Sequence, residues 1–157
     1  MSSDRTPRLL PTILALILLM SAGAAAQPDP ARFSGDRAMH WLVAQCDLGP
    51  RPPGSAALEE LRVMIEDHAR ELDLPVWRLC FPSHDPLSGE PLEICNIVVS
   101  CGPRGGDRLW FGAHYDTRPI ADRDPDPARR DEPILGANDG ASGVAVLLHL
   151  MELLAAD

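Results

Sequence analysis

The chain has 157 residues, of which 45% are hydrophobic and 24% are charged, and its formal net charge is −9. A negative net charge argues against nucleic acid as a partner, because binding to phosphates needs clustered basic residues. All 14 basic residues other than histidine are arginines, and the absence of lysine excludes a P-loop lysine, a Schiff-base lysine and a Ser-Lys dyad.

The N-terminus has the features of an export signal. A short basic region precedes an apolar run, Leu9 to Met20, and small residues follow as far as Ala26. This pattern predicts a signal peptide over residues 1–26, with cleavage before Gln27. The apolar run is shorter than the about 20 residues of a transmembrane helix, which favours a cleaved signal. An uncleaved anchor is the alternative. No stable membrane insertion is expected after cleavage. We therefore expect a periplasmic or extracellular protein, with residues 27–34 as a linker.

Two helices are predicted before the first strand. Helical spacing marks Gly35 to Cys46, and Ser55 is placed to cap a second, amphipathic helix, Ala56 to Leu72. The segment between them, Leu48 to Ser55, contains prolines and glycines that exclude regular structure. His68 falls on the polar side of the second helix, so we expect it to be solvated.

Three strands are predicted next. Val76 to Phe81 and Glu93 to Ser100 are joined by a polar loop, and Arg108 to Ala113 is the third strand. The chain has four cysteines, which allow three pairings in an exported protein. Cys80 and Cys95 lie on the two neighbouring strands and are the predicted disulfide, with free buried thiols as the alternative.

The third strand leads into His114 and Asp116. Residues two apart on an extended chain point to the same side. A carboxylate there can accept the second N–H of the imidazole, as carboxylates do beside metal-bound histidines. A surface hydrogen bond is the alternative interpretation of such a pair taken alone.

A polar, proline-rich insert, Thr117 to Pro133, follows this pair. Its alternating aspartates suggest a calcium loop, but Pro127 and Pro133 occupy positions at which an EF-hand needs Gly and Glu. The calcium interpretation therefore fails, and we predict a solvated loop around the mouth of the site.

Asp139 stands just before the last predicted helix, Gly140 to Ala156, whose apolar residues predict burial against a sheet. The helix dipole favours the anionic form of a carboxylate at this end, which suits a metal ligand. An ordinary Asx cap is the alternative. His149, within this apolar helix, is expected to be a core histidine with satisfied hydrogen bonds rather than a ligand.

The phrases His114-Tyr115-Asp116 and Gly136-Ala137-Asn138-Asp139-Gly140 resemble the zinc-site half of family 28 of the metallopeptidases. That family contains aminopeptidases and the animal-type glutaminyl cyclases, and the Asp/Pro-rich insert is more similar to the bacterial glutaminyl cyclases. The resemblance runs from roughly Leu48 to the last residue. In this family a phrase similar to residues 48–55 lies close to the active-site rim, whereas the residues alone favour an ordinary turn.

The resemblance implies a fold and a metal. The expected fold is α/β, a three-layer α/β/α arrangement with a mixed, twisted sheet, present over residues 35–157 as its N-terminal half. The expected metal is zinc, with His114 and Asp139 as candidate ligands and Asp116 as the candidate catalytic residue. Asp139 would bind zinc in both branches of the family. His114, held by Asp116, would be a ligand in the two-zinc aminopeptidases but not in the one-zinc cyclases.

The resemblance also implies an enzyme whose substrates are the N-termini of peptides or proteins. The insert favours a glutaminyl cyclase, which converts an N-terminal Gln to pyroglutamate and releases ammonia. A two-zinc aminopeptidase and a catalytically inactive fragment are the alternatives. The family's remaining ligands, a Glu and a His, and its general-base Glu would lie beyond Asp157.

Overall fold

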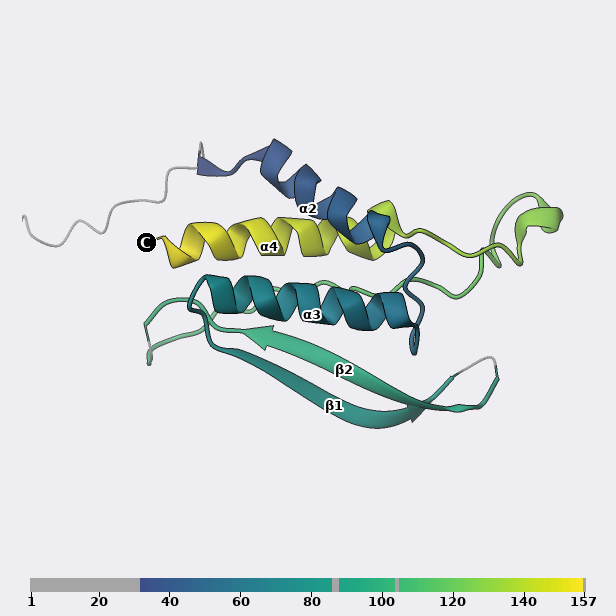
Figure 1. Cartoon of the computed structure of the whole chain (residues 1–157), viewed down its shortest axis with the longest axis horizontal. Helices are drawn as coiled ribbons and strands as arrows, with labels where there is room; N and C mark the ends of the chain where they lie inside the picture. Colours follow the sequence, from purple (N-terminus) through teal and green to yellow (C-terminus); the bar gives the residue numbers. More distant parts are fainter. Residues whose placement is uncertain (1–31, 86–87, 104, 157) are drawn as a thin grey trace, which may run out of the picture. The chain divides into compact units, whose positions relative to one another are not determined.

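The computed structural model describes residues 32–156 with the exception of 86–87 and 104. The predicted signal peptide, residues 1–26, and most of the predicted linker lie outside the described residues. The helices and strands in chain order are α2 (Gly35–Asp47), α3 (Ala56–Glu71), β1 (Val76–His84), β2 (Pro91–Val99), a 3-10 turn (Pro127–Arg129), a turn of π-helix (Ala137–Ala141) and α4 (Ser142–Ala155) (Figure 1). None of the described helices is long and apolar enough to cross a membrane.

Serine side chains begin both α2 and α3, because each accepts a hydrogen bond from a backbone N–H of the first turn. Ser34 accepts from the N–H of Arg37 at 3.2 Å, and Ser55 accepts from the N–H of Leu58 at 3.2 Å. Both helices lie within one residue of their predicted bounds, and the cap at Ser55 is confirmed.

His68 of α3 is buried, so the prediction that it is solvated is wrong. Its ring packs against the ring of Trp41 from α2, with 4.3 Å between centroids. Its Nε2 lies 3.3 Å from the carbonyl oxygen of Leu148 in α4. The polar side of α3 therefore faces two other helices at this position, which the pattern of α3 alone does not reveal.

The two strands form an antiparallel hairpin in which Cys80 stands directly opposite Cys95. A disulfide joins these two cysteines, which confirms the predicted pair, while Cys46 and Cys101 carry free thiols. Both strands extend beyond their predicted bounds into the connecting loop, because the cross-strand pairing continues as far as His84 and Pro91.

The hydrophobic core lies mainly between α3 and α4. Its buried members are Leu61, Ile65, Val144, Leu148 and Met151, and half-buried side chains from α2 and β2 pack around them. Figure 1 shows α4 running between α2 and α3. The prediction that α4 is buried against a sheet is only partly right, because its buried face packs mainly against α2 and α3, and Val146 and Leu154 remain exposed.

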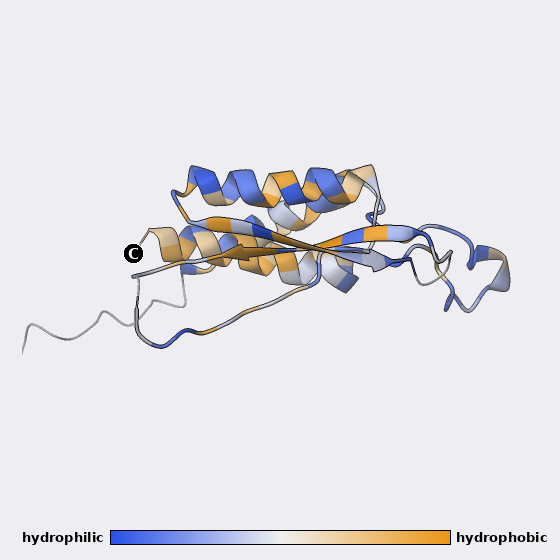
Figure 2. Ribbon diagram, turned by 90° about the horizontal axis from the view of Figure 1, so that it is seen from below, coloured by the Kyte–Doolittle hydropathy of each residue, from blue (hydrophilic) through white to orange (hydrophobic). Residues whose placement is uncertain are grey.

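The predicted third strand, Arg108–Ala113, does not form: the described residues contain a two-stranded sheet, and this segment is not in it. Its apolar side chains lie in solvent, with Leu109 87%, Trp110 78% and Phe111 66% exposed. In Figure 2 the segment is a coil with hydrophobic residues at its centre. The α/β class is confirmed, but of the expected mixed sheet the described residues contribute one antiparallel pair.

Candidate metal centre

His114 and Asp116 lie on the same side of their segment, as the spacing predicts. The Nδ1 atom of His114 is 3.2 Å from Oδ1 of Asp116. The chain here is extended without belonging to a sheet, so the period-two argument holds although the strand does not form.

Asp139 faces the other nitrogen of the same ring. The Nε2 atom of His114 is 2.9 Å from Oδ1 of Asp139, and the two residues are 25 positions apart in the chain. Asp139 has non-helical angles, φ −88° and ψ 96°, and Ala141 rather than Asp139 is the N-cap of α4. The alternative of an ordinary Asx cap is therefore not what the structure contains.

Two carboxylates thus face the two nitrogens of one imidazole, which can donate to both only as the cation. Partial burial lowers the pKa of His114, but the hydrogen bonds to Asp116 and Asp139 outweigh it and raise the pKa above its ordinary value. In the cationic ring, the second N–H proton lies between His114 and Asp139 and offsets the negative charge of the Asp139 carboxylate. A divalent cation could take over that role.

Two glycines let the turn before α4 approach this histidine. Gly140 has φ +102°, and a Cβ there would lie 2.9 Å from the carbonyl oxygen of Asp116 and 3.1 Å from Cε1 of His114. Gly136 has φ +65°, and its Cβ would lie 2.5 Å from Cγ2 of Thr117. Any side chain at either position would push Asp139 away from His114.

A buried arginine fixes the segment just after Asp116. The backbone N–H of Arg51 donates to Oγ1 of Thr117 at 2.9 Å, and the N–H of Thr117 donates back to the carbonyl of Arg51 at 3.0 Å. The guanidinium donates to the carbonyl oxygens of Gln45, Gly49 and Leu135. Burial lowers the pKa of Arg51 from its usual value. Residues 48–55 therefore adjoin the candidate site. The interpretation of this segment as an ordinary turn overlooked Arg51. Only the family resemblance indicated that the segment lies near the site.

His149 is the core histidine that was predicted. Its Nε2 accepts from the backbone N–H of Ser34 at 2.9 Å, and its Nδ1 lies 2.8 Å from Oε2 of Glu152. The insert after Asp116 is largely exposed, as predicted for a solvated loop, and it surrounds an open hollow of about 490 Å³ lined in part by Arg118, Asp122 and Arg129.

The donor atoms near His114 suit zinc. Zinc binds imidazole nitrogen and carboxylate oxygen at about 2.0–2.2 Å, so two ligand atoms of a tetrahedral site lie about 3.4 Å apart. The observed 2.9 Å between His114 and Asp139 is close to that separation. Both side chains are more than half exposed, so an ion can reach them from solvent.

No third ligand stands with His114 and Asp139 at metal-binding distance within the described ranges. The one cluster of three potential ligands found there is Cys80, Glu93 and Cys95. Its two sulfurs are joined in the disulfide, and a metal binds the thiolate form of cysteine, so that cluster is not a metal site.

Residues 96–157 match peptidase family M28. A mouse protein, glutaminyl-peptide cyclotransferase-like protein, is 29% identical over 131 residues, which are 82% of this chain and 30% of the mouse protein.

Two solved structures have the same fold over most of this chain. The glutaminyl cyclase of Porphyromonas gingivalis is 34% identical with a TM-score of 0.75, and the match covers 80% of this chain and 43% of the cyclase. A zinc-dependent exopeptidase of Parabacteroides distasonis is 31% identical with a TM-score of 0.75, over 80% of this chain and 42% of the exopeptidase. The chain therefore spans less than half the length of each of these relatives. Residues 96–157 match peptidase family M28, and the chain is similar in fold to glutaminyl cyclases and zinc exopeptidases over about two fifths of their length.

Proposed function

We propose that this protein is a zinc-dependent enzyme that acts on the N-termini of peptides, and specifically a glutaminyl cyclase. The observation that carries the proposal is the contact of His114 with Asp139, 25 residues away, inside the part of the chain that matches family M28. The likeness to the P. gingivalis glutaminyl cyclase and the Asp/Pro-rich insert support the cyclase over other activities of the family.

Each of the three site residues has a distinct role in this proposal. Asp139 binds the zinc ion, which in a cyclase polarises the γ-amide carbonyl of an N-terminal Gln. Asp116 accepts a hydrogen bond from Nδ1–H of His114 and so fixes the orientation and tautomer of the ring. His114 presents Nε2 beside Asp139, where it lines the zinc site or acts as a second ligand.

A two-zinc aminopeptidase is the second candidate function. The intact pair of His114 and Asp116 is compatible with either function, and by resemblance this histidine is a ligand only in the two-zinc branch. The likeness to the P. distasonis zinc-dependent exopeptidase supports the aminopeptidase.

Metal content and substrate choice separate the two functions in protein isolated from its native host. A cyclase should contain one zinc per chain, release ammonia from Gln-initiated peptides and leave Leu-initiated amides intact. Two zincs together with release of free amino acids would favour the aminopeptidase. Asp139→Ala should abolish either activity, and retained turnover in that variant would refute the assignment of the zinc ligand.

Export to the periplasm or the extracellular space is part of the same proposal, since the N-terminal pattern is that of a signal peptide. Mature protein from the native host should begin at or near Gln27, as shown by the mass of its N-terminal peptide. Recovery of a cytoplasmic form that begins at Met1 would contradict export.

A further inference from the structure

Tyr115 stands between His114 and Asp116, and its side chain points the opposite way. Side chains alternate along an extended segment, so the two polar residues face the candidate site while the tyrosine turns toward the protein. Tyr115 is half-buried and packs against the hydrophobic core. It is also the single tyrosine of the chain.

The phenol of Tyr115 uses its hydrogen-bonding capacity as both donor and acceptor. Its O–H donates to the carbonyl oxygen of Cys95, and its oxygen accepts from Nε of Arg62 at 2.9 Å. The guanidinium of Arg62 also lies over the tyrosine ring, 5.7 Å from its centroid. The ring and hydroxyl therefore hold Tyr115 at two independent points of the fold.

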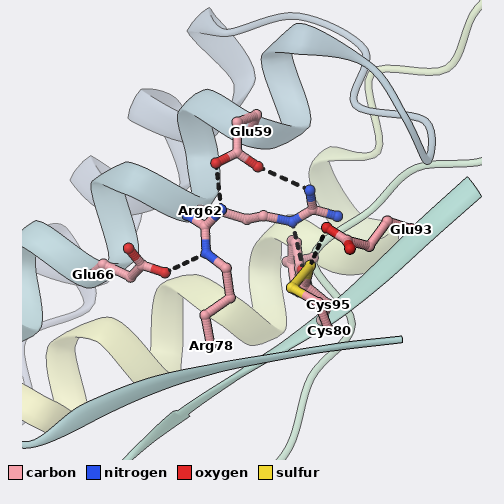
Figure 3. Close-up of a disulfide and its surroundings, with 8 residues drawn as sticks. Glu59, Arg62, Glu66, Arg78, Cys80, Glu93 and Cys95 are labelled. Atoms are coloured by element: carbon pink, nitrogen blue, oxygen red, sulfur yellow. Dashed lines mark hydrogen bonds and ion pairs between the residues drawn. A yellow bond between two sulfur atoms is a disulfide. The ribbon is translucent and has the colours of Figure 1, made fainter. Parts of the chain in front are cut away.

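Both of these points are fixed in their own right. Cys95 is buried, pairs with Cys80 across the hairpin and is joined to it by the disulfide. Arg62 is buried on α3 and donates to Oε2 of Glu59 at 2.9 Å, one helical turn away. Figure 3 shows Arg62 reaching from its helix toward the disulfide of the hairpin.

On the N-terminal side of His114 the backbone lacks sheet hydrogen bonds to other described residues, although the half-buried Ala113 packs against the hydrophobic core. Residues 108–113 join no sheet within the described ranges, so no ladder of hydrogen bonds fixes the entry to the site. On the C-terminal side, the backbone pair of Thr117 with Arg51 supplies such support. Between these two regions, Tyr115 supplies a hydrogen-bonded side-chain anchor.

We infer that Tyr115 is a positioning residue for the pair of His114 and Asp116, held by the Cys95 carbonyl of the disulfide-bonded hairpin and by Arg62. This inference rests on the proposed function in one respect, namely that the metal beside His114 and Asp116 is zinc. The orientation of His114 itself is a property of the metal-free protein and is tested without metal.

The test measures how fast each histidine reacts with diethyl pyrocarbonate in Tyr115→Phe, resolved by peptide mass spectrometry. At about pH 8 the unprotonated imidazole is the reacting form. In the metal-free protein we expect His114 to react several-fold faster in the variant than in the wild type, because its ring loses its fixed contacts. His84, which is exposed, is the internal standard, and the buried His68 and His149 report that the fold is intact.

Zinc supplies a second measurement on the same histidine. Zinc bound beside His114 should protect it, and the midpoint of protection should rise at least about tenfold in Tyr115→Phe, as for other partners of metal-binding residues. Trp41→Phe is the matched control, because it also removes one aromatic hydrogen-bond donor, to Glu152, on another helix. That control should leave both measurements at His114 unchanged.

The outcomes separate the inference from the proposed function. Equal reactivity of His114 in the wild type and in Tyr115→Phe, with His68 and His149 still protected, overturns the positioning role. Absence of zinc protection in the wild type, or protection that survives Asp139→Ala, overturns the zinc site but leaves the metal-free result decisive. If Tyr115→Phe exposes the buried histidines, Arg62→Gln removes one of the two hydrogen bonds of the phenol, the one from Arg62, and is judged by the same criteria.

Discussion

At the scale of single residues, Gly140 decides whether Asp139 can reach His114. A methyl group at position 140 would lie 2.9 Å from the carbonyl oxygen of Asp116, and the backbone φ of +102° disfavours every residue but glycine. We expect Gly140→Ala to lower the free energy of unfolding by roughly 1–3 kcal/mol and to separate His114 from Asp139. Urea unfolding followed by tryptophan fluorescence measures the loss.

Gly102→Ala is the control for this substitution. Gly102 also has a positive φ, +81°, but an added Cβ would meet no atom within 4 Å. Gly102→Ala should therefore show the conformational cost of a positive φ without a steric clash of the added methyl group. A loss in Gly140→Ala no larger than in Gly102→Ala would show that the approach of the turn to Asp116 is not tightly packed.

Glu152 is the residue whose titration should dominate acid sensitivity between α2 and α4. Burial raises the pKa of this carboxyl, but hydrogen bonds from Arg37, His149 and Trp41 outweigh it and bring the pKa down to about 2. A depressed pKa means that the unfolded chain takes up a proton first as the pH falls. The stabilisation is therefore complete above the unfolded pKa of about 4.5 and is lost progressively as the pH falls toward about 2.

We expect Glu152→Gln to be less stable than the wild type by about 2–3 kcal/mol at pH 6, and this difference to shrink as the pH falls below about 4. Urea unfolding at a series of pH values measures it. Glu60→Gln, an exposed substitution on α3, is the control. A difference that is the same at every pH would show that the carboxylate charge of Glu152 is not what stabilises the helix pair.

At the scale of elements, the disulfide fixes the hairpin on which the Tyr115 anchor depends. Cys80 and Cys95 are 15 residues apart, and closing a loop of that length restricts the unfolded chain by about 3 kcal/mol. The variant with both cysteines changed to alanine should lose stability of that order. It should also raise the reactivity of His114 toward diethyl pyrocarbonate, because the carbonyl of Cys95 becomes less fixed.

Cys46→Ala with Cys101→Ala is the matched control, because it removes the two cysteines that form no disulfide. Those changes should leave the reactivity of His114 toward diethyl pyrocarbonate at its wild-type value. Lower stability without any change at His114 in the Cys80 and Cys95 variant would mean that the hairpin supports the fold but not the site.

The helices and the hairpin were predictable because their signals are local. Helical spacing marks the first helix, Ser55 caps the second, and the facing cysteines lie on strands with a polar loop between them. The segment from residue 108 to 113 has strand composition as well, but a strand exists only where another strand pairs with it. Composition cannot supply that partner, so the prediction failed there.

The site was predictable to the same extent. The pair of His114 and Asp116 follows from a period of two, and its geometry is confirmed. The contact with Asp139 depends on the positive φ of Gly140, a glycine visible in the sequence whose conformation is not. The burial of His68 and the anchoring by Arg51 depend on neighbours from distant elements, which no local pattern encodes.

At the scale of the whole molecule, the described surface carries two apolar stretches. One follows alternate positions of β1, where Trp77, Leu79 and Phe81 are exposed, and the other is residues 109–111. Exposed apolar surface and unpaired extended backbone both promote association between copies. We therefore expect residues 27–157, produced alone, to be poorly soluble above micromolar concentrations.

The same polypeptide should bind zinc weakly and show no turnover. Catalytic zinc sites use three protein ligands, and His114 and Asp139 supply two. The general-base Glu expected by resemblance is not among these residues either, and a general base typically contributes about 10²–10⁴-fold to the rate. Calorimetric titration with zinc and an ammonia-release assay on a Gln-initiated peptide, both at micromolar protein, measure the two properties.

Asp139→Ala gives the control for both measurements. Weak zinc binding that disappears in this variant, with no turnover in either protein, is the expected result. Tight, stoichiometric zinc together with turnover that is lost in Asp139→Ala would contradict the prediction. It would mean that residues 27–157 form a complete site, in which a ligand and a general base other than those implied by the resemblance join His114 and Asp139.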